Sequence, residues 1–173
     1  MTVSKILVEP DPILRKKCLM VDEVNKDVQK LMNDMLETMY DAPGIGLAAI
    51  QIGILKRVVV IDLSKDVKKK EPLFFANPEI IFKSENKSTY EEGCLSIPEQ
   101  FAEIERSSEC HIKYLDYYGK NQTLKAKGLL ATCIQHEIDH LNGILFIDYL
   151  SKLKKTMIIK KLSKQKKSER VVV

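Results

Sequence analysis

The sequence has no long apolar run, few cysteines and only three histidines. Its first residues are polar and mixed, which excludes the apolar core of a secretory signal peptide. No stretch approaches the roughly 20 apolar residues that a membrane-spanning helix needs. The four cysteines, at positions 18, 94, 110 and 133, are too sparse for a disulfide scaffold. These absences predict a protein of the reducing cytoplasm that has no membrane partner.

The chain has 173 residues, enough for one domain with a proper core. Its 45% apolar and 30% charged residues are ordinary for a globular protein. The basic residues are unevenly distributed. Residues 151–173 contain nine Lys or Arg and one acid, whereas the rest of the chain has more acids than bases. We therefore expect a single domain at 1–150, followed by a basic C-terminal helix and tail at 151–173.

Two of the three histidines, His136 and His140, lie four residues apart with Glu137 between them. On a helix this spacing puts both imidazoles on one face, where they can reach one metal ion. Glu137 lies about 100° around the helix from His136, beside the ion rather than on it. That is the position of a base for a metal-bound water. The alternative is a surface helix with two chance histidines, which the scarcity of histidine disfavours.

A catalytic metal site needs a third ligand, and the sequence after the motif does not supply one. Phe146 stands where an extended motif has its third histidine, and the one later glutamate, Glu169, lies in the lysine-rich tail. Upstream, Cys94 follows a glycine and precedes a proline-bounded turn. A thiolate is a natural third ligand with two imidazoles. Cys133, one turn below His136, is better suited to lining a pocket, so Cys94 is preferred.

A second segment, GIGLAAIQIG at 44–53, combines three glycines with two alanines. Small residues permit close backbone approach, but the spacing is not that of a phosphate-binding loop. Gln51 has two readings, which the residues leave open. It is either a hydrogen-bonded polar residue in a turn or a donor that aims an amide N–H at a developing oxyanion.

Hydrophobic periodicity predicts helices over 25–40, 129–141 and 149–163. We interpret the methionine-rich face of the first helix as core packing. Residues 57–63 are apolar enough for a strand that is buried on both faces. The predicted strands are 57–63, 73–75, 79–82, 111–117 and 123–126, with a break at Asn77-Pro78 and a hairpin between the last two.

Three blocks occur in a fixed order: GIGLAAIQIG at 44–53, EGCLSIP at 92–98 and QHEIDH at 135–140. Together they resemble the peptide deformylases, over roughly residues 4–152, and three ordered blocks are specific. The resemblance implies an α+β fold, with antiparallel sheets packed around a central metal-binding helix and a C-terminal helix. It implies that the enzyme removes the N-terminal formyl group from formyl-methionyl nascent peptides and releases formate, with residues 1–150 as the catalytic domain.

The resemblance also assigns the metal centre. The ligands are Cys94, His136 and His140, and family members typically use Fe²⁺ and often accept ions such as Zn²⁺, Ni²⁺ or Co²⁺. Glu137 is the general base for the metal-bound water that attacks the formyl carbon. A structural zinc site is the alternative, and Glu137 together with only three ligands argues against it.

The remaining assignments concern the oxyanion and the substrate. The oxyanion donors are the side chain of Gln51 and the backbone N–H of Leu95. Two departures from the family pattern are Thr132, polar where an aliphatic residue is common, and Phe101, where a basic residue is frequent. The resemblance implies a pocket for the methionine side chain that comprises Ile45, Leu129, Thr132, Cys133 and His136. The peptide cleft comprises the backbone of Ile45, Gly46, Glu92 and Gly93. Arg106 is expected near the mouth of this cleft.

Two other functions compete with this one. A zinc endopeptidase would share the His-Glu helix, and a non-enzymatic ribosome- or RNA-binding protein would depend on the basic tail alone. Some deformylases use a basic C-terminal helix near the ribosomal exit tunnel, so the resemblance predicts ribosome binding through residues 152–170. A solvated helix with a disordered end is the plain alternative. A membrane-surface helix is disfavoured because the stretch lacks Trp and Phe.

Overall fold

The computed structural model describes the backbone of residues 2–171 and the side chains of residues 2–167. Met1, Val172 and Val173, at the ends of the predicted domain and tail, lie outside the described residues. The α-helices are α1 (Lys26–Asp41), α2 (Gly128–Leu141) and α3 (Lys152–Val171), and the 3₁₀ helices are η1 (Pro12–Arg15), η2 (Ala49–Ile52) and η3 (Phe146–Tyr149). The strands are β1 (Gly46–Ala48), β2 (Val58–Ile61), β3 (Leu73–Lys83), β4 (Lys87–Cys94), β5 (Ile97–Ser107), β6 (Glu109–Leu115) and β7 (Asn121–Lys127).

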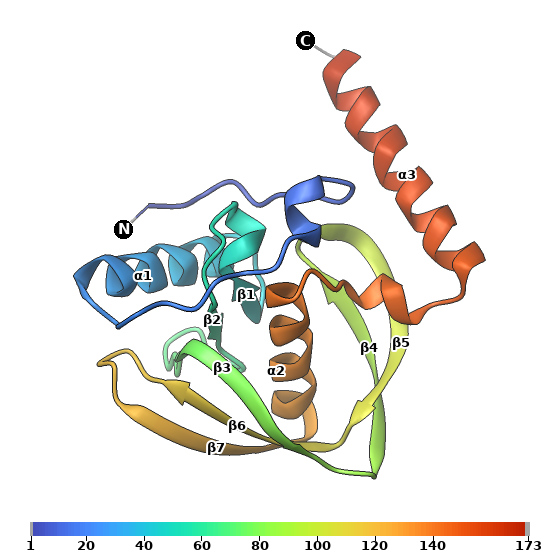
Figure 1. Cartoon of the computed structure of the whole chain (residues 1–173). Helices are drawn as coiled ribbons and strands as arrows, with labels where there is room; N and C mark the ends of the chain where they lie inside the picture. Colours follow the sequence, from blue (N-terminus) through green and yellow to red (C-terminus); the bar gives the residue numbers. More distant parts are fainter. Residues whose placement is uncertain (1, 172–173) are drawn as a thin grey trace.

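Helix α2 stands in the centre of the molecule, between a five-stranded sheet and the long β4–β5 hairpin (Figure 1). The sheet has the strand order β1-β2-β3-β6-β7, and every neighbouring pair is antiparallel. This arrangement confirms the predicted α+β class with antiparallel sheets around a central helix. No helix in the described part of the chain combines the length and apolar character needed to cross a membrane.

Strand β2 joins the two main cores, because all four of its residues are buried. Val59 and Ile61 belong to the core that includes α2. Val58 and Val60 point to the opposite face and belong to the core that includes α1. The prediction of a strand buried on both faces is therefore confirmed.

Helix α1 begins where the sequence predicts. The side chain of Asn25 accepts a 3.0 Å hydrogen bond from the N–H of Val28, which caps the helix. Met32, Met35 and Met39 are fully buried in the core between α1 and the sheet. The interpretation of the methionine-rich face as core packing is confirmed.

The β4–β5 hairpin is the longest element that the sequence analysis missed, and the short strand β1 was not predicted either. The strands of the hairpin are joined by a turn of two residues, Leu95 and Ser96, with Cys94 paired to Ile97. A second difference lies in β3, which is one strand rather than two. Asn77 takes up the irregularity with a φ of 50°, and the register shifts between Ala76 and Glu79. A bulge thus accommodates the proline that was expected to end the strand.

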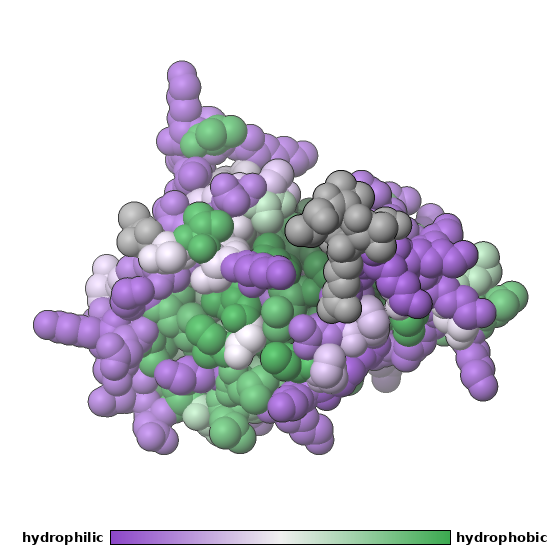
Figure 2. Space-filling view, turned by 90° about the horizontal axis from the view of Figure 1, so that it is seen from above, coloured by the Kyte–Doolittle hydropathy of each residue, from purple (hydrophilic) through white to green (hydrophobic). Residues whose placement is uncertain are grey.

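Helix α3 is longer than predicted and projects from the body (Figure 1). Leu162 is buried in a third core with residues of β5 and η3, and Ile158 packs against that core. Leu153 and Met157 are 72% and 51% exposed, so only part of the expected apolar face docks on the body. Seen from above, apolar surface lies in the middle of the face, and hydrophilic residues surround it, including on the side of α3 (Figure 2).

Candidate metal centre and active site

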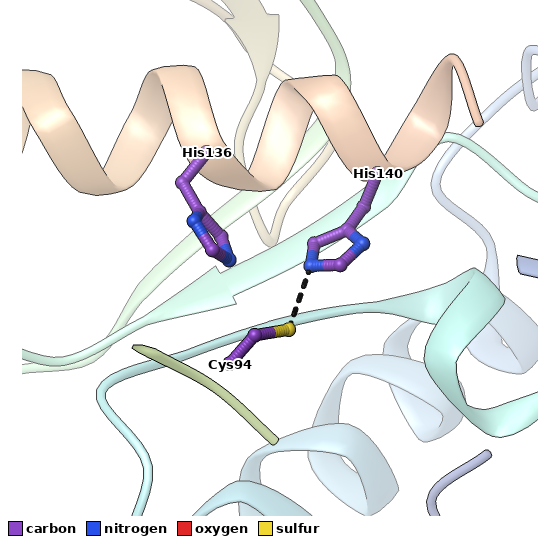
Figure 3. A group of neighbouring side chains, drawn as sticks. All are labelled: Cys94, His136 and His140. Atoms are coloured by element: carbon purple, nitrogen blue, oxygen red, sulfur yellow. Dashed lines mark hydrogen bonds between the residues drawn. The ribbon is translucent and has the colours of Figure 1, made fainter. Parts of the chain in front are cut away.

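The C-terminal half of α2 carries polar side chains into the protein interior. His136, Glu137 and His140 are only 8%, 5% and 1% exposed. The rings of His136 and His140 have centroids 4.9 Å apart, as expected for residues one helical turn apart. Both rings point from α2 toward the same place (Figure 3).

Cys94, the last residue of β4, points toward the same place. Its Sγ lies 3.2 Å from Nε2 of His140. The ligand atoms of Cys94, His136 and His140 all lie within 4.8 Å of one another, and the three side chains converge (Figure 3). One thiolate and two imidazoles suit a divalent ion that keeps a further position for water or substrate. The group could therefore hold a catalytic metal ion.

A chain of buried charges fixes the orientation of His136. Nδ1 of His136 lies 2.8 Å from Oε1 of Glu92, which leaves Nε2 for a metal. Arg106 donates to both oxygens of Glu92, at 2.7 and 3.0 Å, and to Oδ2 of Asp139 at 2.8 Å. Burial opposes these charges, yet the contacts lower the pKa of Glu92 and raise that of Arg106. Each buried charge is thus paired.

The two imidazoles differ in the protonation state that their surroundings favour. Burial lowers the pKa of His140 well below its usual value, which favours the neutral form that a metal requires. Burial also opposes a charge on His136, but hydrogen bonds with Cys94 and Glu92 raise its pKa well above its usual value. A metal at this site therefore competes with a proton on His136.

The carboxylate of Glu137 lies beside the three candidate ligands and against the backbone of β1. A Cβ on Gly46 would come within 2.5 Å of Oε1 of Glu137, so only glycine leaves room for this carboxylate. Burial raises the pKa of Glu137 to about 7. Its Oε2 is buried and has no hydrogen-bond partner among the described residues. A carboxyl group with such a pKa can take up and return a proton near neutral pH.

The side-chain amide of Gln51 approaches the same point from η2. Nε2 of Gln51 lies 3.5 Å from Sγ of Cys94 and 3.1 Å from Oγ of Ser96. The backbone N–H of Ala48 donates to Oε1 of Gln51 at 2.9 Å, which fixes which end of the amide carries the donors. Leu95 is the first residue of the turn after Cys94, so its backbone also lies next to the candidate ligands.

A cavity of about 460 Å³ opens beside these residues, which is enough for the end of a peptide. It is walled by β1, the β4–β5 hairpin and α2. Seven of the predicted substrate-binding residues line it, together with most of the predicted catalytic groups. The substrate-binding residues are Ile45, Gly46, Glu92, Gly93, Leu129, Thr132 and Cys133, and the others are Gln51, Cys94, Leu95, His136 and Glu137.

Comparisons with known proteins identify the family of this chain. The family model described as polypeptide deformylase matches residues 3–156. The chain belongs to the polypeptide deformylase family. It is 64% identical over 173 residues to the peptide deformylase of Pelagibacter ubique (strain HTCC1062), covering 100% of both chains. It is 54% identical over 168 residues to that of Rhizobium meliloti (strain 1021), covering 97% of each.

Solved deformylases share the whole fold. The peptide deformylase from Ehrlichia chaffeensis superposes with a TM-score of 0.92 at 38% identity, covering 97% of this chain and 99% of that one. The same protein in complex with actinonin gives a TM-score of 0.91 at 41% identity, covering 95% of this chain and 98% of that chain. Deformylases are metal-dependent hydrolases, and the group of Cys94, His136 and His140 offers this deformylase a possible metal site.

Arg106 does not lie where the resemblance suggested. We expected it near the mouth of the peptide cleft, but it is 5% exposed and lies behind Glu92, outside the cavity lining. The physical reason is its pairing with the buried Glu92 and the partly buried Asp139, together with the ring of Tyr149 at 4.8 Å. In this deformylase Arg106 supports the candidate metal centre from behind.

Other residues of the site were not predicted. Tyr90 and Ile97 line the cavity because they lie on the missed hairpin, and so does Phe101, which the sequence analysis noted only as a departure from the family pattern. Phe101 is 65% exposed and packs over Gly93, where a Cβ would come within 2.6 Å of its ring. Ser96 lies against Gln51 and is fully buried. Its position inside the EGCLSIP block was the one signal that could have found it.

Proposed function

We propose that this deformylase removes the formyl group from N-formyl-methionyl peptides with the residues that surround Glu137. The observation that carries the proposal is the buried convergence of Cys94, His136 and His140 beside a carboxyl group, at the wall of a cavity. In the reaction the formyl C–N bond breaks, water supplies a hydroxyl group to the formyl carbon, and the products are formate and a free amine.

The donor set favours a divalent ion that accepts both sulfur and nitrogen. An ion held by Cys94, His136 and His140 would supply Lewis acidity toward water and the formyl oxygen. We propose Fe²⁺ as the native ion, with Zn²⁺, Ni²⁺ or Co²⁺ as substitutes, because thiolate and imidazole ligands suit all four. Metal analysis of protein purified without oxygen tests this identity.

Glu137 moves the proton in this proposal. Its carboxylate takes a proton from the attacking water and returns it to the leaving amine, which departs as a neutral group. The pKa of about 7 supports both transfers, since a group that titrates near the working pH can act as base and then as acid. Its location beside the ligands keeps it free for this task.

Gln51 and Leu95 stabilise the charge that develops on the formyl oxygen. Nε2 of Gln51 lies 3.5 Å from Sγ of Cys94, so an amide donor faces the reaction centre. The N–H of Leu95 lies in the turn after β4, outside the pairs of the strand ladder. Fixed donors of this kind stabilise an oxyanion strongly in a site from which water is excluded.

The methionine side chain enters the apolar part of the cavity. We assign it to Ile45, Leu129, Thr132 and Cys133, with the ring of His136 as one wall. The small space around the candidate ligands admits a formyl group and disfavours larger acyl groups. The backbone of Gly46 and Gly93 lies along the cleft, and a peptide that runs here meets this backbone and the ring of Phe101.

Hydrolysis assays test the proposed function directly. Protein loaded anaerobically with Fe²⁺ is offered a formyl-methionyl tripeptide, its acetyl analogue and an unblocked peptide with internal bonds, and formate and amine are measured. We expect formate from the first substrate alone. Cleavage of an internal peptide bond would favour the endopeptidase. A protein that retains no metal after loading and hydrolyses none of the three substrates would favour a non-enzymatic binding protein.

We further propose that residues 1–150 are the catalytic domain and that residues 151–173 serve as a basic appendage in the cytoplasm. The unpaired cysteines and the nascent-peptide substrate support that compartment. The lysines of α3 support binding to ribosomal RNA phosphate through residues 152–170. Such binding would keep the enzyme near emerging nascent chains.

Ribosome co-sedimentation at increasing salt tests the tail. Replacing Lys152, Lys154, Lys160 and Lys161 by Gln should weaken co-sedimentation, while hydrolysis of a short formyl peptide stays unchanged. The matched control replaces four lysines of the body, Lys68, Lys113, Lys120 and Lys125, by Gln. Equal binding by the two variants at low salt would show that α3 is a solvated helix without this partner.

A further inference from the structure

The side-chain amide of Gln51 is fixed at both of its ends. Oε1 accepts a 2.9 Å hydrogen bond from the N–H of Ala48, and Nε2 donates a 3.1 Å hydrogen bond to Oγ of Ser96. Gln51 is 1% exposed and Ser96 is fully buried, so water does not compete for these contacts. One hydrogen bond would let the amide plane pivot, whereas two bonds at opposite ends hold it in one orientation.

The backbone brings these two residues together from distant parts of the chain. Gln51 lies in η2, and Ser96 is the second residue of the turn between β4 and β5. The N-terminal segment bonds to both. The N–H of Leu7 donates to the carbonyl of Gln51 at 2.7 Å, and the N–H of Glu9 donates to the carbonyl of Ser96 at 2.9 Å. The distance between the hydroxyl and the amide is therefore set by backbone hydrogen bonds.

We infer that Ser96 is a positioning residue for the reaction, one that acts through Gln51. Its hydroxyl oxygen accepts one N–H of the Gln51 amide, and this contact turns the second N–H toward the reaction centre, where Sγ of Cys94 lies 3.5 Å from Nε2. The inference rests on the proposed role of Gln51 as an oxyanion donor. A donor stabilises developing charge in proportion to how well it is oriented beforehand.

A double-mutant cycle tests the inference in the metal-loaded enzyme. Ser96→Ala should lower kcat for a formyl-methionyl tripeptide by about tenfold, the effect of one misdirected hydrogen bond. KM and bound metal should stay unchanged. Gln51→Ala should lower kcat by about 10²–10³-fold. In the Gln51→Ala enzyme, adding Ser96→Ala should cost nothing further, because the group that Ser96 directs is gone.

A spectroscopic reading makes the test independent of activity. In ¹⁵N-labelled protein, Ser96→Ala should shift the side-chain amide resonance of Gln51 and speed its hydrogen exchange. Ser96→Thr, which keeps a hydroxyl, should return both the resonance and kcat toward wild type. The control is Ser107→Ala, since Ser107 is also buried but pairs with Lys87 away from the site. It should leave kcat and the Gln51 resonance unchanged.

The outcomes separate the two hypotheses. If Ser96→Ala lowers kcat equally with and without Gln51, Ser96 does not act through that amide, and the inference fails while the role of Gln51 stands. If Gln51→Ala itself leaves kcat unchanged, the proposed oxyanion role fails and the inference fails with it. If Ser96→Ala lowers kcat only while Gln51 is present, and also shifts the Gln51 resonance, both the role of Gln51 and the inference about Ser96 are supported.

Discussion

Helices α2 and α3 lie in opposite environments, the first inside the protein and the second at its surface. Helix α2 lies between the sheet and the hairpin, and ten of its 14 residues are buried, Glu137 among them. The 20 residues of α3 project from the body, and two of its apolar residues, Leu153 and Met157, face outward. The difference shows which part of the fold can hold catalytic side chains in one orientation. Inside, each polar group needs a defined partner, whereas outside, water serves every group equally.

The partners of α2 come from elements far along the sequence. Glu92 of β4 orients His136, and Arg106 of β5 neutralises Glu92. Removing one member would leave a buried charge without its counterpart, which costs several kcal/mol. On α3, Lys155 pairs with Asp148 but stays 35% exposed, so the loss of this pair costs less than the loss of a buried one. We therefore expect substitutions in α2 and its partners to abolish the reaction, and substitutions in α3 to alter stability or binding alone.

The largest effect is expected at Cys94. Cys94→Ala should lose bound metal and activity together, because two imidazoles on one helix do not suffice to hold a catalytic ion. Metal content and formate release are measured on the same preparation. Cys18→Ala and Cys110→Ala are the controls, since both thiols are buried away from the site. Stoichiometric metal in the Cys94 variant would mean that another residue is the third ligand.

Glu137 should separate metal binding from turnover. Glu137→Gln keeps the shape of the side chain and removes its ability to carry a proton. Since Glu137 lies beside the candidate ligands, the metal should remain, while kcat falls by about 10²–10⁴-fold. Loss of the metal in this variant would identify Glu137 as a ligand instead. The measurement pairs steady-state kinetics with metal analysis.

Gly46 should matter through Glu137 alone. A methyl group at this position would press on Oε1 of Glu137 at 2.5 Å and displace the carboxylate. A displacement of about 1 Å can cost up to about 10²-fold in rate, so Gly46→Ala should lower kcat by tenfold or more, roughly, with metal retained. In the Glu137→Gln enzyme the same change should add little. Full activity of Gly46→Ala would refute the close packing.

The sequence predicted the parts of the site that depend on local geometry. His136, Glu137 and His140 follow from helical spacing, and the close approach at Gly46 follows from the absence of a side chain. The β4–β5 hairpin escaped prediction because its outer face is charged and its inner face lacks a regular apolar alternation. Everything that the hairpin carries was harder to place, above all the contact between Gln51 and Ser96, which joins residues 45 positions apart.

The position of Arg106 could not be predicted from the sequence either. The resemblance placed it near the mouth of the peptide cleft, and arginine is rarely buried without a partner. Its partners, Glu92 and Asp139, lie 14 and 33 positions away in the sequence. Only the folded chain shows that they meet. Tertiary pairing of charges, unlike helical spacing, has no local signature.

On α3, Leu162 should control stability without touching the reaction. It is 2% exposed and packs in the core with Ile104 and Phe146. Leu162→Ala should lower the free energy of unfolding by about 2–5 kcal/mol, the usual cost of truncating a buried leucine. Leu153→Ala is the matched control, because Leu153 is 72% exposed. The variant that remains folded should keep the wild-type kcat, and a reduced kcat would tie α3 to the site.

The smallest effect is expected at the ion pair that ties α3 to the body. Nζ of Lys155 lies 2.7 Å from Oδ1 of Asp148, and Arg15 holds the other oxygen at 2.7 Å. Burial opposes the charge on Asp148, but Lys155 and Arg15 lower its pKa, so the carboxylate is charged at neutral pH. The Lys155 side chain is 35% exposed. Partly exposed pairs contribute about 0–1 kcal/mol, and salt weakens them.

Lys155→Gln should therefore lower the free energy of unfolding only slightly, and the difference from wild type should vanish in concentrated salt. Arg15→Gln is the informative comparison, because Arg15 also pairs with the buried Glu9 at 3.2 Å and its loss leaves that carboxylate without its cation. It should cost more than Lys155→Gln and respond less to salt. Urea unfolding at low and high ionic strength measures both. A large, salt-independent loss at Lys155 would mean that α3 is joined to the body as firmly as α2 is.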